Sequence, residues 1–139
     1  MTTTPAIWAE EKGTAYIFAG APNLIKYVKG RNEFQTVPSN LPPVRYATQA
    51  VWNGRYGYIV GFEGGSGGLD SGIIIQFDPE DEVFYPIPLE GHFDWTLYNW
   101  QFAAVVYVEK LNRIYMFGGY RPDVYNDGIY YIELDPIDP

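Results

Sequence analysis

Apolar residues alternate with polar residues along this chain, or form blocks of a few residues, and this pattern predicts strands. No window of about 11 residues or more shows the 3.6-residue period of a helix. Strands are expected at residues 5–9, 15–20, 24–28, 33–37, 47–52, 57–62, 73–77, 83–87, 102–108, 114–119 and 129–134. Gly, Pro, Asn and Asp separate them, which are the residues that tight turns require. We therefore expect an all-β chain.

The expected strands repeat in units. Tyrosines hold one register in three of them, at Tyr16, Tyr58 and Tyr115, and each of these strands lies between two others. Phe34 and Phe84 mark a fourth strand in the first two units and lie 50 residues apart. The pattern predicts three four-stranded antiparallel units, the last without its fourth strand. Four-stranded units of about 45–50 residues are typical of β-propeller blades.

Two segments resemble kelch repeats. Residues 45–61 read RYATQAVWNGRYGYIVG, and residues 103–119 read AAVVYVEKLNRIYMFGG. The resemblance implies a propeller that binds a partner and is not an enzyme. The chain departs from the kelch pattern, because only Gly118-Gly119 keeps the double glycine and Phe34 and Phe84 replace the usual tryptophan. A hemopexin-like four-bladed propeller is the rival interpretation, but the Asp-Pro and Asn-Gly turns favour kelch.

One domain is expected over residues 1–139, with blade 1 at about 5–45, blade 2 at about 46–95 and blade 3 at about 96–139. Closed propellers have about four to eight blades, so three blades leave two apolar faces uncovered. We expect a homodimer that completes six blades, in which residues 1–4 pair with strand 129–134 of the neighbouring subunit. The alternative is that the chain is a fragment of a longer propeller.

Candidate binding residues lie in the long connections. In antiparallel blades, the loops between second and third strands and those between blades share one face. These loops are extended in blade 2, in blade 3 and between them, and loops carry function more often than scaffolds do. The candidate ligand-binding residues are Glu63, Asp70, His92, Asp94, Trp95, Tyr98, Tyr120, Arg121, Asp123 and Tyr125. Aromatic rings beside carboxylates and amides suit peptide or carbohydrate recognition.

The amino-acid composition limits the classes of binding partner that are expected. The net charge is -8, and no stretch concentrates Lys or Arg, so neither nucleic acid nor an anionic membrane surface is expected as a partner. No apolar run approaches the about 18 residues that span a bilayer. The absence of cysteine excludes disulfides and thiolate metal sites and favours a cytoplasmic location, as does the lack of a signal peptide. His92 is the only histidine, so no metal site or cofactor is predicted.

Three functions are compatible with these residues. The first is a non-enzymatic kelch-type module that binds a protein or peptide through the face that bears the long loops. The alternative is a lectin-like carbohydrate-binding propeller that uses the aromatic loops. A propeller enzyme acting through carboxylates such as Glu63, Asp94 and Asp123 ranks third, because the sequence contains no motif for a nucleophile.

Overall fold

The structure is a computed structural model that describes residues 5–18, 23–41, 44–63, 71–87, 104–117, 120–121, 124–125 and 129–136. For residues 44–48, 61–63, 71–73, 120–121 and 124–125 it describes the backbone without the side chains.

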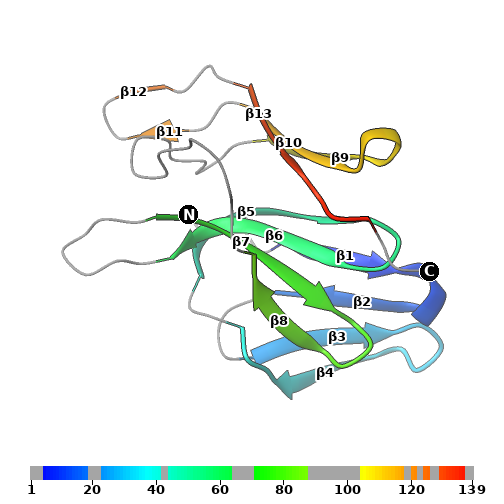
Figure 1. Cartoon of the computed structure of the whole chain (residues 1–139). Helices are drawn as coiled ribbons and strands as arrows, with labels where there is room; N and C mark the ends of the chain where they lie inside the picture. The colour runs from blue at the N-terminus through cyan, green and yellow to red at the C-terminus, as the bar shows by residue number, and fades with distance from the viewer. Residues whose placement is uncertain are drawn as a thin grey trace.

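The described strands form antiparallel sheets in which neighbours follow one another along the chain (Figure 1). The first sheet contains β1 (Ala6–Ala9), β2 (Thr14–Ile17), β3 (Asn23–Val28) and β4 (Glu33–Pro38). The second sheet contains β5 (Val44–Trp52), β6 (Gly57–Glu63), β7 (Ser71–Asp78) and β8 (Val83–Pro86). The third sheet contains β9 (Ala104–Val108), β10 (Arg113–Phe117) and β13 (Ile129–Glu133).

The predicted all-β chain with sheets of four, four and three strands is therefore confirmed. A two-stranded hairpin of β11 (Tyr120–Arg121) and β12 (Val124–Tyr125) was not predicted. Single turns of 3-10 helix, η1 (Glu10–Lys12) and η3 (Glu109–Leu111), were not predicted either. The segment 1–4, expected to close the ring as a strand, lies outside the described residues.

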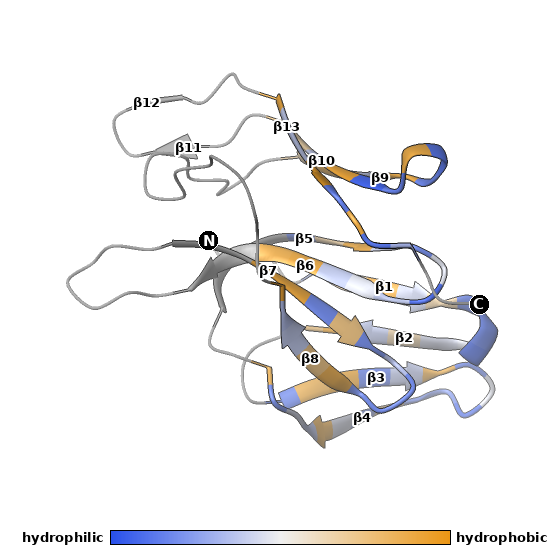
Figure 2. Ribbon diagram, in the orientation of Figure 1, coloured by the Kyte–Doolittle hydropathy of each residue, from blue (hydrophilic) through white to orange (hydrophobic). Residues whose placement is uncertain are grey.

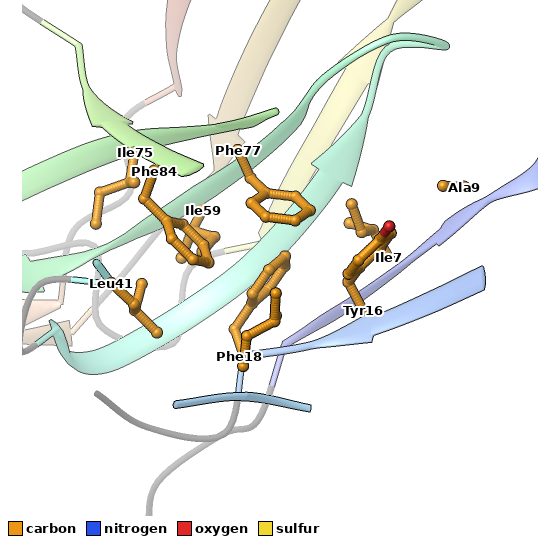
Figure 3. Close-up of a cluster of buried hydrophobic side chains, with 10 residues drawn as sticks. Ile7, Ala9, Tyr16, Phe18, Leu41, Ile59, Ile75, Phe77 and Phe84 are labelled. Carbon is orange, nitrogen blue, oxygen red and sulfur yellow. The ribbon is translucent and has the colours of Figure 1, made fainter. Parts of the chain in front are cut away.

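The second sheet lies between the other two and is buried on both faces. Ile59 of β6 and Phe77 of β7 belong to a core shared with the first sheet, drawn in Figure 3. Tyr58 and Val60 belong to a second core shared with the third sheet. Successive side chains of a strand point to opposite faces, so the unbroken apolar run from Tyr58 to Val60 supplies both cores. The hydrophilic residues gather instead at the turns (Figure 2).

The three repeated tyrosines all point the same way through the three stacked sheets. Tyr16 is buried between the first and second sheets, and Tyr58 between the second and third. On β10, the neighbours Ile114 and Met116 face the second sheet, so Tyr115 faces away from it. Each tyrosine therefore points from its own sheet towards the position of the next one.

The sheets approach one another at their first strands. β1 makes close backbone contact with β5, and β5 with β9. The other described strands show no comparable approach between sheets, because the remaining extensive contacts join strands of the same sheet or hairpin. The sheets thus converge along β1, β5 and β9 and spread towards their later strands.

The outer edge of the second sheet is covered in part by a side chain. Asn40, in the connection between the first two sheets, donates from Nδ2 to the carbonyl oxygen of Phe84 at 2.9 Å. Its Oδ1 accepts a hydrogen bond from the Phe84 backbone N–H at 2.8 Å. The amide thereby makes both hydrogen bonds that a neighbouring strand would make, which protects the edge strand β8.

Replacing Asn40 by aspartate is expected to lower the free energy of unfolding by about 1–3 kcal/mol, because the Phe84 carbonyl loses its donor and faces a carboxylate. Equilibrium urea unfolding measures the change. Asn23→Asp introduces the same charge at an exposed position of β3 and is expected to stay within about 0.5 kcal/mol of the wild type. Equal stability of both variants would contradict this role for Asn40.

Candidate functional site

The two ends of the sheets differ in their connections. At one end, here called the turn end, the connections are residues 10–13, 29–32, 53–56, 79–82 and 109–112, each four residues long. At the opposite end, here called the loop end, they are longer and unequal: residues 18–22, 39–43, 64–70, 87–103 and 118–128. The loop-end connections therefore differ in length between the repeats, whereas the turn-end connections all have the same length.

A common backbone conformation explains the uniform turns. The last residue before the next strand has positive φ in four of them, at Gly13, Asn32, Glu82 and Asn112. Short hairpin loops commonly place a left-handed residue there, because it aims the chain back along the partner strand. In the fifth turn, Gly54 has φ 98°, and Asn53 Oδ1 accepts hydrogen bonds from the backbone N–H groups of Arg55 and Tyr56.

The charged residues of the turn end hold neighbouring elements together. Lys26 Nζ lies 3.1 Å from Glu82 Oε2, and Lys12 Nζ lies 3.7 Å from Glu80 Oε1, so both pairs join the first sheet to the second. Glu80 and Glu82 both belong to the acidic β7–β8 turn, which spans residues 79–82. Neither pair has a local sequence signal, because its two residues lie far apart in the chain.

Within the second sheet, Arg55 donates two hydrogen bonds to Asp78, at 2.6 and 3.1 Å. Burial opposes ionisation of Asp78, but the hydrogen bonds from Arg55 and from the Glu80 backbone hold its pKa below the ordinary value. A hollow of about 30 Å³ lies beside this pair, between η1 and the turns of the second sheet. It has the volume of about one water molecule, far below the about 300–1,000 Å³ of a ligand pocket. The charged pairs of the turn end therefore link neighbouring structural elements.

Four of the ten candidate binding residues lie on described strands at the loop end. Glu63 ends β6 and pairs with Ser71 at the start of β7. Tyr120, Arg121 and Tyr125 belong to the β11–β12 hairpin, in which Tyr120 lies opposite Tyr125. The hairpin follows β10 and precedes β13, and Figure 1 shows it beyond the ends of these two strands.

The other six candidates are Asp70, His92, Asp94, Trp95, Tyr98 and Asp123, and all lie outside the described residues. The hairpin had no clear sequence signal, because two-residue strands are too short to show alternation. Its position nevertheless brings three of the candidates to the end of the third sheet, where the longest of the second-to-third-strand connections lies.

Within the described part of the chain, no group of three or more His, Cys, Asp or Glu side chains is arranged to hold a metal ion. The same residues include no helix that is long and apolar enough to cross a membrane. No protein-family model matches the chain, and no curated protein shows significant sequence similarity to it. The kelch assignment therefore stays a prediction that rests on the repeated motifs.

Proposed function

We propose that the chain is a kelch-type half-propeller that binds a protein or peptide at its loop end and is not an enzyme. The observation that carries this proposal is the contrast between the two ends. All five turn-end connections have the same length, whereas the loop-end connections are long and differ from repeat to repeat. Rigid scaffolds with variable loops at one end are a common way to build a binding surface.

The blade interpretation is supported by the arrangement of the sheets. Each is an antiparallel meander with strands in chain order, and the sheets converge along β1, β5 and β9. In a propeller, the first strands of the blades lie nearest to a common axis. Three sheets are fewer than the about four to eight of a closed ring. Two copies provide twice three sheets, and we propose that the chain closes as a homodimer.

A peptide or protein partner is preferred because the described part of the loop end consists of strand ends and the short β11–β12 hairpin. Protein and peptide partners engage extended surfaces and edges, whereas small ligands need concave pockets. A peptide-selection experiment, with glycan-binding and hydrolysis assays beside it, distinguishes this function from the lectin-like and enzymatic alternatives.

The test is selection of peptides from a displayed library by the purified chain, followed by titration of the selected peptides. Arg121→Glu, in the β11–β12 hairpin, is expected to weaken their binding at least about tenfold, which is about 1.4 kcal/mol. Lys110→Glu makes the same charge change at an exposed residue of the turn end and is expected to change binding less than about twofold.

Three results would contradict the proposed function. Loss of binding in Lys110→Glu with retention in Arg121→Glu would place the site at the turn end. Binding to a glycan array, without selection of any peptide, would favour the lectin-like alternative. Hydrolysis of a bound substrate, abolished in Asp94→Ala, would favour the enzyme.

A further inference from the structure

The aromatic core between the first two sheets is built from two pairs of rings (Figure 3). The first sheet supplies Tyr16 and Phe18, and the second sheet supplies Phe77 and Phe84. Ring centroids of Tyr16 and Phe77 lie 4.9 Å apart, those of Phe18 and Phe84 lie 5.6 Å apart, and both contacts are edge-on. Phe77 and Phe84 are directly opposite each other on β7 and β8, with centroids 4.7 Å apart.

The first sheet carries an equivalent of the Phe77–Phe84 pair on its opposite face. Tyr27 and Phe34 are directly opposite each other on β3 and β4, with ring centroids 5.2 Å apart. Phe34 stands 50 residues before Phe84 and occupies the same place in the repeat. Phe84 is only 2% exposed, whereas Phe34 is 69% exposed. The first sheet therefore exposes an aromatic pair whose equivalent in the second sheet is buried against the first sheet.

The third sheet carries an equivalent of the Tyr16–Phe18 pair. Tyr115 and Phe117 lie two residues apart on β10, on the face turned away from the second sheet, and their rings are stacked with centroids 6.2 Å apart. Phe18 is 5% exposed, whereas Phe117 is 39% exposed. The third sheet thus exposes an aromatic pair whose equivalent in the first sheet is buried against the second sheet.

Apolar neighbours extend both faces. On the first sheet, strand register places Trp8, Ala15, Tyr27 and Phe34 in one row across the strands. On the third sheet, it places Val106, Tyr115 and Tyr131 in one row, with Ala104, Phe117 and Ile129 in the next. Large exposed apolar patches mark interaction surfaces. We call these two surfaces the first end face and the third end face.

Charged residues border both end faces. The β3–β4 turn beside the first end face contains Lys29 and Arg31, both exposed. The third end face is bordered by Glu133, which is exposed and paired with Arg113 at 2.7 Å. Lys26 lies opposite Tyr16 and pairs with Glu82 of the second sheet, whereas the corresponding residue opposite Tyr115 is Tyr131. The aromatic rows, and not a charged pair, therefore define the proposed contact between copies.

We propose that the third end face of one copy packs on the first end face of a second copy, with Tyr115 and Phe117 against Tyr27 and Phe34 of the partner subunit. This contact rests on the proposed half-propeller and specifies how the dimer closes. The partner is a second copy of the chain, because each chain carries both of the aromatic pairs that form this contact. Two copies related by a twofold axis cover both end faces of each chain at once.

Light scattering over a concentration series tests the contact, and the wild type is expected at about twice the chain mass of 15.8 kDa. Phe34→Glu alters only the first end face, and Phe117→Lys alters only the third. Each variant is expected to raise the dimer Kd at least about a hundredfold, because a charge would be buried in an apolar contact. Tyr85→Glu is the control, since Tyr85 is an exposed aromatic residue on the second sheet, and it is expected to remain dimeric.

Mixing the two variants makes the test specific. In a mixed dimer, one junction is wild type and the other joins the introduced glutamate of one subunit to the introduced lysine of its partner. An equal mixture is therefore expected to restore the dimer. Should one variant fail to fold by itself, co-refolding both in equal amounts gives the same readout. A monomeric wild type, disruption by only one of the two variants, or a mixture that stays monomeric would each overturn the contact.

The mass measurement requires no ligand, so its result is separate from that of the peptide titration. A chain that dimerises as described but selects no peptide would contradict the proposed binding function and leave the contact standing. A monomeric chain that binds peptides through Arg121 would contradict the contact and leave the binding function standing.

Discussion

Replacing Phe77 by alanine is expected to lower the free energy of unfolding by about 3–5 kcal/mol. Phe77 is completely buried and its ring contacts those of Tyr16, Phe18 and Phe84. The substitution removes a full ring from a region where two sheets meet, and the surrounding strands cannot close the cavity without losing their own pairing. Domains of this size are stable by about 5–15 kcal/mol, so the variant is expected to lose a large part of its total stability.

Equilibrium urea unfolding, followed by far-UV circular dichroism, measures the loss. Phe34→Ala is the matched control, because it removes the same atoms from an exposed position. At concentrations where the chain is monomeric, it is expected to cost less than about 1 kcal/mol. A Phe77→Ala variant as stable as Phe34→Ala would show that the first and second sheets are not packed through this aromatic core.

Stability is expected to fall steeply between about pH 10 and pH 12 because two tyrosines are buried in the two cores. Burial, with smaller contributions from Glu82 and Glu80, raises the pKa of Tyr16 to about 12. Burial, with a smaller contribution from Tyr56 and others, raises the pKa of Tyr58 to about 12. In the unfolded chain both titrate near a pKa of about 10. Above about pH 10 the unfolded state therefore binds fewer protons than the folded state, and stability decreases with pH.

The expected loss is of order 2–3 kcal/mol for each tyrosine, complete near pH 12 and absent below about pH 9. Urea unfolding at a series of pH values measures it. Tyr16→Phe keeps the ring and removes the ionisable group, so its stability is expected to fall less steeply over the same range. Identical pH profiles for the wild type and the variants Tyr16→Phe and Tyr58→Phe would contradict the assignment, since general charge repulsion affects all three alike.

Local sequence patterns were sufficient to predict the strands and their grouping. Short apolar blocks ended by turn residues predicted the strands of the three sheets. The shared register of Tyr16, Tyr58 and Tyr115 predicted which positions of the three sheets are equivalent. These signals are local, because side-chain alternation and turn chemistry depend on residues close together in the chain. The Asn53-Gly54 turn is an example, since Asn53 forms its hydrogen bonds with residues two and three positions ahead.

Contacts between sheets could not be predicted in the same way. The Lys26–Glu82 ion pair and the Asn40–Phe84 hydrogen bonds join residues far apart in the chain, and no spacing in the sequence indicates them. The candidate site has the same limitation. Loop lengths predicted which end of the sheets varies, and the strands place Glu63 and the β11–β12 hairpin at that end. The choice of ligand depends on side chains in long connections, where sequence pattern carries little structural information.

The shared direction of the three tyrosines has a consequence for any assembly of several copies. A stack with two different ends can add copies without limit, and such head-to-tail contacts form filaments unless the rotation between units closes a ring. The convergence of β1, β5 and β9 supplies that rotation. If the chain dimerises as proposed, changes that separate these inner strands would keep both end faces but remove the curvature, and are expected to favour open filaments over closed dimers.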